Sequence, residues 1–348
     1  MEVDYIVGSK KEFYDFVNLI THRDRVAIVT HIDLDGLASG IFLEKILEAK
    51  NIPLDYIDFV TIKQDMVKEA SVKLNALGIT KVFFCDLGID SIDPEGFIDL
   101  RKDMDVFLID HHPLSENFSD KRKVIKTGSN DCSAMTIFDL GKNIFDTDSW
   151  RWLNCAAIFS DFSYKKQDNF EYIKSVYPEV NMENISGSTP GIIARKIASA
   201  LIYYEHNKKY VYELVKQRKL DELNDIHSII EEEIDNLIEE FPNKKIYSEK
   251  QDLYFYEIES KFNVVSSVTS LISKMKPESS FVFMQRWGDV IKFSARNQSG
   301  NRDMGSLMRS CVAGFEEANG GGHAPAAAAK IKEGDLDEFK SRLLGLEK

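Results

Sequence analysis

The sequence predicts an α/β protein with a mostly parallel sheet in its first domain, a helical connector, and a smaller α/β domain at the end. Apolar runs of strand length alternate with helical periodicity through residues 1–112, as a parallel sheet with crossover helices requires. Residues 166–250 are polar, charged and largely helical in pattern, and new strand patterns start near Gln251. We therefore expect domains at 1–165 and 251–348, joined by a connector at 166–250.

In the first domain, near-continuous apolar runs predict strands that are covered on both faces of their sheet. The expected strands span Arg25–His31, Asp55–Ile62, Val82–Gly88 and Val106–His112. Other stretches space their apolar residues as helices do. The expected helices span Leu37–Ala49, Gln64–Leu77, Cys132–Ile144 and Trp150–Phe162.

The connector includes an amphipathic helix pattern with an acidic outer face at Asp221–Glu240. A solvated connecting helix explains this pattern more simply than a surface that docks a partner. In the second domain we expect strands at Leu253–Ile258, Phe281–Trp287 and Val290–Arg296, and helices at Val264–Ser273 and Gly305–Ala318. The aromatic residues that alternate along these strands indicate core positions rather than platforms for nucleobases. They are Tyr254, Tyr256, Phe281 and Phe283.

Composition indicates a soluble, cytoplasmic protein. Of the 348 residues 43% are apolar, which is ordinary for a globular chain. No run approaches the roughly 18 apolar residues that a membrane span needs, and the N-terminus lacks the pattern of a secretory signal. The four cysteines are scattered without metal-site spacing, as expected for reduced thiols.

The net charge of −13 lies entirely in the first 250 residues. Residues 251–348 carry 13 basic and 13 acidic side chains, whereas residues 1–250 carry 31 basic and 44 acidic ones. A protein that grips a long duplex by neutralising many phosphates carries a basic excess. Any nucleic-acid ligand is therefore short, or bound cations reverse the field of the acidic part.

Side chains that bind divalent cations stand where the predicted strands end. They are His31, Asp33, Asp35, Asp86, Asp110, His111 and His112, with Asp161 further along the chain. Carboxylates combined with imidazoles suit Mn²⁺, or Mg²⁺, better than a structural zinc. At a strand end Asp33 and Asp35 point to the same side, because side chains alternate with period two, so both can reach one pocket. Two cations about 3.5–4 Å apart would relieve the repulsion among these carboxylates and activate a water.

Each of these motifs has an ordinary explanation when it is taken alone. An aspartate after a strand is usually a helix cap or a surface residue, and a histidine pair is usually structural. The coincidence of three strands ending in ligand-type residues, with a fourth site downstream, favours a metal centre. Ligands in open α/β sheets bind beyond the carboxyl ends of the strands, where these residues stand.

A glycine run in the second domain is a candidate phosphate site. Gly320, Gly321 and Gly322 let backbone N–H groups approach an anion, and His323 and Arg296 could contact phosphate oxygens. A flexible turn with a surface histidine is the simpler explanation of the run by itself.

These motifs together resemble the DHH/DHHA1 phosphoesterase family. The segments HIDLDGLASG, CDLG, IDHHP and SDFS, followed by SARNQSG and NGGGHAPAAAA, carry the resemblance over residues 20–165 and 252–340. That family includes RecJ single-strand exonucleases, NrnA-like oligoribonucleases that also act on pAp, and cyclic-di-AMP phosphodiesterases. The first motif is most similar to the archaeal RecJ-like branch.

The resemblance implies a role for each motif position. Asp33 would bind one cation and Asp35 the other, Asp86 would bridge them, and His111 and Asp161 would complete the second site. His112 would face the scissile phosphate, while Arg296, Gly320, Gly321, Gly322 and His323 would bind substrate. The active site would lie in the cleft between the two domains. His31 stands where RecJ-type proteins often carry aspartate, and Val29 replaces the histidine of oligoribonuclease-type members, so the role of His31 stays open.

The resulting hypothesis is a Mn²⁺-dependent exonuclease or oligonucleotidase that acts on single-stranded DNA or RNA. A second hypothesis is a small-nucleotide hydrolase that acts on pAp or cyclic dinucleotides. A third is an inactive scaffold for replication or repair proteins, although such scaffolds typically lose the metal ligands that this chain keeps. The sequence leaves open the polarity of digestion and the oligomeric state, with a dimer as one option.

Overall fold

The computed structural model describes residues 3–63, 65–115, 118 and 121–345. They form two compact units, Met1–His227 and Ser228–Lys348, called unit 1 and unit 2 below. Each unit has its own six-stranded sheet. Within the described part of the chain, no helix is long and apolar enough to span a membrane.

The sheet of unit 1 has the order β1-β6-β5-β4-β2-β3. Its strands are β1 (Tyr5–Val7), β2 (Val26–His31), β3 (Tyr56–Val60), β4 (Lys81–Cys85), β5 (Asp105–Asp110) and β6 (Val124–Thr127). All neighbouring strands pair in parallel except β1 with β6. The predicted mostly parallel sheet is therefore confirmed.

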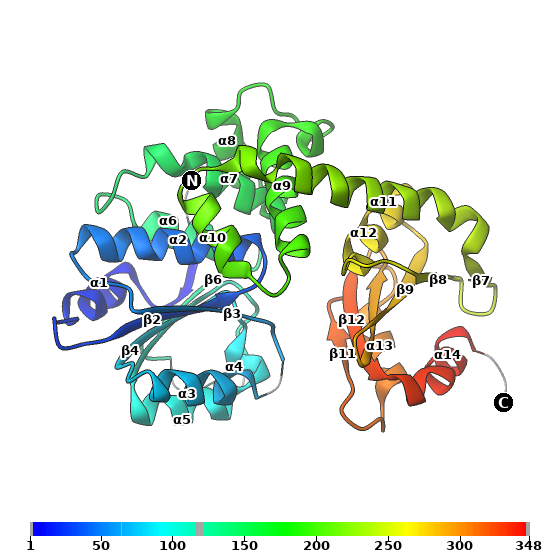
Figure 1. The fold of residues 1–348 in the computed structure, drawn as a ribbon, viewed down its shortest axis with the longest axis horizontal. Helices are drawn as coiled ribbons and strands as arrows, with labels where there is room; N and C mark the ends of the chain where they lie inside the picture. The colour runs from blue at the N-terminus through cyan, green and yellow to red at the C-terminus, as the bar shows by residue number, and fades with distance from the viewer. Residues whose placement is uncertain (1–2, 64, 116–117, 119–120, 346–348) are drawn as a thin grey trace. The chain divides into compact units, whose positions relative to one another are not determined.

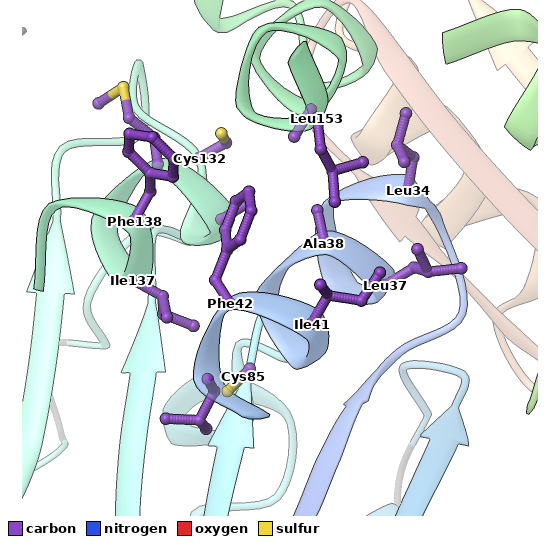
Figure 2. Close-up of a cluster of buried hydrophobic side chains, with 14 of the residues drawn as sticks. Leu34, Leu37, Ala38, Ile41, Phe42, Cys85, Cys132, Ile137, Phe138 and Leu153 are labelled. Carbon is purple, nitrogen blue, oxygen red and sulfur yellow. The ribbon is translucent and has the colours of Figure 1, made fainter. Parts of the chain in front are cut away.

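Helices cover both faces of this sheet (Figure 1), which explains why its central strands are almost uniformly apolar. One face packs against α1 (Lys10–Asn18), α2 (Leu34–Ala49), α6 (Ser133–Leu140) and α7 (Arg151–Ser160). The other face packs against α3 (Met66–Ala76), α4 (Ile89–Ile92) and α5 (Pro94–Asp103). Figure 2 shows α2 at the centre of the first layer, with Phe42 beside Phe138 of α6 and Leu34 near Leu153 of α7.

The chain reverses its direction of winding between β2 and β4. From β2 it crosses to β3 on one side, then returns to β4 on the other side and continues outward through β5 and β6. The carboxyl ends of β2 and β4 therefore lie at a topological switch point, where open α/β sheets bind ligands.

Most of the polar middle segment belongs to unit 1. Helices α8 (Gln167–Val176), α9 (Thr189–Tyr203) and α10 (Lys208–Lys216) contribute buried residues such as Ile173, Ile197 and Val211 to the α2 layer. Helix α11 (Asn224–Lys244) contains the boundary between the two units. A helical region thus joins the two α/β units, as expected.

Unit 2 contains a mainly antiparallel sheet with the order β11-β12-β10-β9-β8-β7. Its strands are β7 (Ile246–Ser248), β8 (Leu253–Ile258), β9 (Ser280–Trp287), β10 (Val290–Arg296), β11 (Asn319–Gly322) and β12 (Ala326–Lys332). Helices α13 (Met304–Val312) and α14 (Leu336–Leu344) pack on one face, and α12 (Val265–Met275) contacts β9 and β10. Tyr256, Phe281 and Phe283 are buried against Phe241 of α11, so they are core residues as predicted, whereas Tyr254 is only half-buried.

The predicted elements of both units are present, with ends that shift by a few residues. The predicted helix Gln64–Leu77 corresponds to α3, and its first residue, Gln64, lies outside the described residues. The glycine run differs more, because it forms the edge strand β11 rather than a loop. We did not expect β1, β6 or β7, which are only three or four residues long.

Gly36 provides a test of how tightly the start of α2 packs on β2. A Cβ at this position would overlap the backbone carbonyl of His31, whereas Gly187 has nothing within 4 Å of its ideal Cβ. We predict that Gly36→Ala lowers the free energy of unfolding by about 1–3 kcal/mol, because neither backbone segment can move aside freely. Gly187→Ala, an exposed position in the same unit, is the control and should change stability little. Equal denaturation midpoints for the two variants would contradict this packing.

Candidate metal centre

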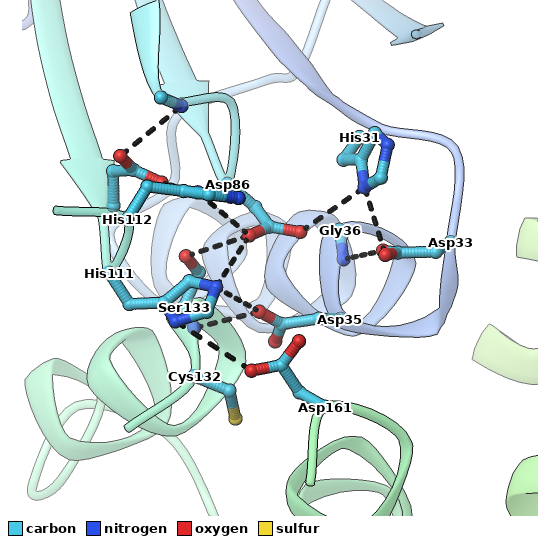
Figure 3. A network of polar contacts seen from close by, with 12 residues as sticks. His31, Asp33, Asp35, Gly36, Asp86, His111, His112, Cys132, Ser133 and Asp161 are labelled. Carbon is cyan, nitrogen blue, oxygen red and sulfur yellow. Dashed lines mark hydrogen bonds and ion pairs between the residues drawn. The ribbon is translucent and has the colours of Figure 1, made fainter. Parts of the chain in front are cut away.

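Seven of the eight candidate residues form overlapping ligand groups at the carboxyl edge of the unit 1 sheet (Figure 3). His31 ends β2, Asp86 follows β4, Asp110 ends β5, and Asp161 follows α7. Three groups of side chains have potential ligand atoms within 4.8 Å of one another. The groups are His31, Asp33 and Asp86; Asp86, His111 and His112; and Asp35, His111 and Asp161.

The route by which Asp33 and Asp35 reach this edge differs from our expectation. The strand ends at His31, and Asp33 is the N-cap of α2, where its carboxylate accepts a hydrogen bond from Gly36 N at 3.0 Å. Asp35 therefore lies in the first turn of the helix, not on an alternating strand. The sharp turn from strand to helix depends on Gly36, because the absence of a side chain there allows the first turn of α2 to lie close to the backbone of His31.

Asp86 lies between the two outer groups. Its Oδ2 is 3.7 Å from His31 Nδ1, and its Oδ1 is 3.3 Å from His111 Nε2. The hydroxyl of Ser133 also donates to Oδ1, at 3.3 Å. Asp86 has the left-handed backbone conformation (φ 62°), which is unfavourable for a residue with a side chain. The strained conformation directs a 2% exposed carboxylate into the centre of the cluster.

Asp35 is held by the start of another helix. Its two oxygens accept hydrogen bonds from the backbone N–H groups of Ser133 and Ala134, both at 2.8 Å. These groups belong to the first turn of α6, whose unpaired amides and dipole favour an anion. His111 Nε2 is 3.9 Å from Asp35, and His111 Nδ1 is 3.6 Å from Asp161.

The electrostatics of the cluster fit bound cations. Burial, together with Asp86 and Asp161, raises the pKa of the Asp35 carboxyl well above its usual value. Burial also raises the pKa of Asp161 to about 7. Although burial lowers the pKa of the His31 imidazole, the nearby carboxylates of Asp33 and Asp86 raise it well above its usual value. Negative charge is therefore crowded here beyond what the side chains themselves compensate.

The buried Nδ1 of His111 also fits a cation at this site. Its Nδ1 is buried and has no hydrogen-bond partner among the described residues. An unpaired buried polar atom is costly, and metal ions commonly satisfy imidazole nitrogens in carboxylate sites. The donor set of carboxylate oxygens and imidazole nitrogens, without a thiolate, suits Mn²⁺ or Mg²⁺.

His112 makes a different set of contacts from His111. Its Nδ1 is 2.8 Å from Asp110 Oδ1 and 4.0 Å from Asp86 Oδ1. Asp110 itself is fully buried and accepts a hydrogen bond from Gly88 N at 3.2 Å. A carboxylate that holds Nδ1 fixes the ring orientation and leaves Nε2 for another partner.

In unit 2 the structure gives two of the three glycines a packing role. A Cβ on Gly320 would lie 2.7 Å from the carbonyl oxygen of Met308 in α13, and one on Gly322 would lie 2.5 Å from that of Ala326. Gly321 has no such close neighbour, and the guanidinium of Arg309 lies beside it. His323 is exposed, and its backbone pairs with Ala326 to close the turn between β11 and β12.

Arg296 is more enclosed than its predicted role requires. Its guanidinium donates to the hydroxyls of Ser266 and Ser270 and to the carbonyls of Ala295 and Ala327. Burial lowers its pKa. These contacts fix β10 to α12 and β12, and a phosphate contact by Arg296 stays a prediction.

Sequence reasoning missed Ser133, Gly36 and Arg309. Ser133 follows the first residue of a predicted helix, so its position was visible, but nothing in the sequence connected it to Asp86. Gly36 stood inside a recognised motif without a stated role. Arg309 lies on a predicted helix whose neighbour, the β11 edge strand, was not recognised.

The fold and the site together define an α/β protein with a candidate divalent-cation site at the carboxyl edge of its first sheet. Residues 25–148 match the DHH family N-terminal domain, and residues 251–346 match the DHHA1 domain. These matches together cover more than half of the chain. The chain therefore belongs to the DHH/DHHA1 family.

Known proteins share this architecture over nearly the whole chain. An uncharacterized protein of Methanocaldococcus jannaschii is 21% identical, with 98% of this chain and 96% of that protein covered. A crystal structure of the exonuclease RecJ bound to manganese has a TM-score of 0.72 at 15% identity, covering 97% of this chain and 93% of that one. CDC45 from Entamoeba histolytica has a TM-score of 0.61 at 12% identity, covering 97% and 98%. The fold is thus RecJ-like.

The crowded carboxylates predict that cations stabilise the protein. Mn²⁺ at about 100 times its dissociation constant should stabilise unit 1 by about 2.7 kcal/mol per site. Asp86→Asn should remove most of this effect, because Asp86 belongs to two of the three ligand groups. The measurement is thermal denaturation with and without Mn²⁺. Asp99→Asn, an exposed carboxylate of α5 paired with Lys102, is the control and should keep the full stabilisation.

Proposed function

We propose that this protein is a divalent-metal-dependent phosphodiesterase that hydrolyses single-stranded nucleic acid or short oligonucleotides. The observation that carries the proposal is the position of Asp86, whose two oxygens face two separate groups of ligand atoms. A carboxylate shared by two groups is the arrangement that two-metal phosphoesterases require.

Each ligand group has a role in this proposal. Asp33 and Asp86, with His31, would hold one cation, whereas Asp35, His111, Asp161 and Asp86 would hold the other. The short distance from His31 Nδ1 to Asp33 Oδ2, 2.9 Å, supports a place for His31 in the first group. Two divalent cations bound here, Mn²⁺ or Mg²⁺, would neutralise the carboxylates and activate a water for in-line attack on phosphorus.

The remaining residues act on the substrate. His112, held at Nδ1 by Asp110, would present Nε2 to an oxygen of the scissile phosphate. In unit 2 the open face of Gly321, with Arg309 beside it and His323 directly after the strand, would receive a neighbouring phosphate. Arg296 is a further candidate there. The predicted cleft between the domains stays a prediction.

The charge distribution favours a short substrate. The first 250 residues carry 44 acidic and 31 basic side chains, and the last 98 are neutral with 13 of each. A long strand would meet a repulsive field away from the metals. This balance also supports the small-nucleotide alternative, in which pAp or a cyclic dinucleotide is the substrate.

Inactive scaffolds typically lose metal ligands, and the residues kept at this site argue against the scaffold alternative. Asp33, Asp35, Asp86, His111 and Asp161 are all present and converge. The likeness to CDC45 concerns the fold and does not change this argument. A replication or repair partner would therefore bind an active enzyme, and its identity and the oligomeric state stay open.

A substrate panel with Mn²⁺ tests the proposed activity. The panel contains DNA and RNA from dinucleotides to long single strands, together with pAp and cyclic dinucleotides. We predict hydrolysis of single-stranded substrates by the wild type and a loss of at least about a hundredfold in Asp86→Ala, because that change removes a ligand of both cations. Near-wild-type turnover of Asp86→Ala at saturating Mn²⁺ would falsify the two-metal assignment, and pAp as the preferred substrate would favour the small-nucleotide hydrolase.

A second prediction concerns the glycine strand. His323→Ala should weaken oligonucleotide binding roughly ten- to a hundredfold, the effect of losing a charge-assisted phosphate contact of about 1.5–3 kcal/mol. Mn²⁺ binding, measured by calorimetry, should not change. His22→Ala removes an exposed histidine from unit 1 and is the control. The division of labour is wrong if His323→Ala loses a cation or binds every substrate normally.

A further inference from the structure

A lysine is buried directly beneath the candidate metal centre. Lys126 lies on β6, and its side chain is 1% exposed. Its ammonium group is 2.5 Å from Asp90 Oδ1 and 2.5 Å from Asp110 Oδ2, and both of these carboxylates are fully buried. An unpaired buried ammonium would be very costly, and the two carboxylates offset this cost.

The buried ion pairs connect to the site through one carboxylate. Asp110 Oδ2 contacts Lys126 and Gly88 N, while Asp110 Oδ1 contacts His112 Nδ1 at 2.8 Å. Lys126 also donates to the backbone carbonyl of His112 at 3.1 Å. Lys126 therefore holds the main chain of His112 directly and holds the His112 ring through Asp110.

Asp90 completes the arrangement from the opposite side. Its Oδ2 accepts a hydrogen bond from the backbone N–H of Ser115 at 2.8 Å. It thereby ties α4 to the segment that follows His112, and its other oxygen contacts Lys126. Asp90 reaches the imidazole only through Lys126, whereas Asp110 contacts it directly.

We propose that Lys126 is a positioning residue that fixes Asp110, and through it the orientation and tautomer of the His112 ring. The inference rests on the proposed phosphodiesterase function, because it concerns the residue that would face the scissile phosphate. Two contacts on Asp110 Oδ2 leave its Oδ1 a single direction in which to hold His112 Nδ1. Because the ring cannot rotate, Nε2 of His112 keeps one direction, toward the position proposed for the scissile phosphate.

If Lys126 had a purely structural role, its removal would change stability but not the catalytic contribution of His112. Removing one partner of a buried ion pair destabilises a protein strongly, so Lys126→Met alone could fail to fold. Lys126→Met combined with Asp90→Asn keeps the local net charge unchanged, since one positive and one negative charge are removed together. This double variant is therefore the one to use.

The test is a double-mutant cycle that combines Lys126→Met/Asp90→Asn with His112→Ala. Lys126→Met/Asp90→Asn should lower kcat about ten- to a hundredfold in the wild-type background, because a displaced reacting group can cost that much. In the His112→Ala background it should change kcat less than about twofold, since its target is already gone. The affinity for a non-hydrolysable phosphorothioate oligonucleotide should show the same non-additivity, whereas the change in melting temperature should persist in both backgrounds. Full additivity of the kcat effects would overturn the proposal.

Single variants keep the proposal testable if the double variant does not fold. Asp110→Asn should lower kcat and analogue affinity strongly, whereas Asp90→Asn should keep both within a few-fold of the wild type, because Lys126 still holds Asp110. Wild-type kcat and analogue affinity in Asp110→Asn would overturn the proposal, because Lys126 acts on the His112 ring through Asp110. Lys216→Met is the control, because it removes a cation that pairs with Glu44 of α2 rather than with a residue of the candidate metal centre, and it should affect only stability. A wild type that cleaves no substrate would instead count against the proposed function, and analogue affinity would still report on Lys126.

Discussion

Repulsion among the carboxylates at the carboxyl edge of the first sheet is the constraint on which the rest of unit 1 depends. Asp35 and Asp86 are almost fully buried, and Asp33 and Asp161 lie beside them. The fold offsets this charge with the amides of α6 and with imidazoles, while the left-handed backbone of Asp86 directs that carboxylate into the cluster. Such compensation is incomplete, because the pKa of the Asp161 carboxyl is still raised to about 7 by burial. The proposed cations would complete it, and stability would then be linked to the proposed function.

Much of this site could be predicted from the sequence because its residues follow recognisable strands. The apolar runs before His31, Asp86 and Asp110 identified β2, β4 and β5, and a parallel sheet brings the carboxyl ends of such strands to one edge. The position of Asp35 was harder to derive, because one residue decides whether a chain continues as a strand or starts a helix. Asp33 resolves that choice by capping α2.

The parts that sequence reasoning missed depend on contacts between distant segments. Ser133 reaches Asp86 from α6, which is 47 residues further along the chain. Lys126 stands in a strand of four residues, too short for its apolar pattern to stand out. In unit 2 the run of three glycines looked like a loop, yet two of them are needed because α13 and β12 approach β11 closely. Local sequence gives no measure of how near another backbone comes.

The relation of fold to activity follows from the same residues. Proteins as different as RecJ and CDC45 share this architecture at 15% and 12% identity, so the architecture does not decide what the chain does. The deciding features are the side chains at the sheet edge and the buried contacts that hold them. Asp86 has a left-handed backbone conformation, and the buried Nδ1 of His111 has no hydrogen-bond partner among the described residues. Both features are costly in the protein alone, and a cation bound at Nδ1 would offset the second of them, so they support the proposal that this chain keeps a metal centre.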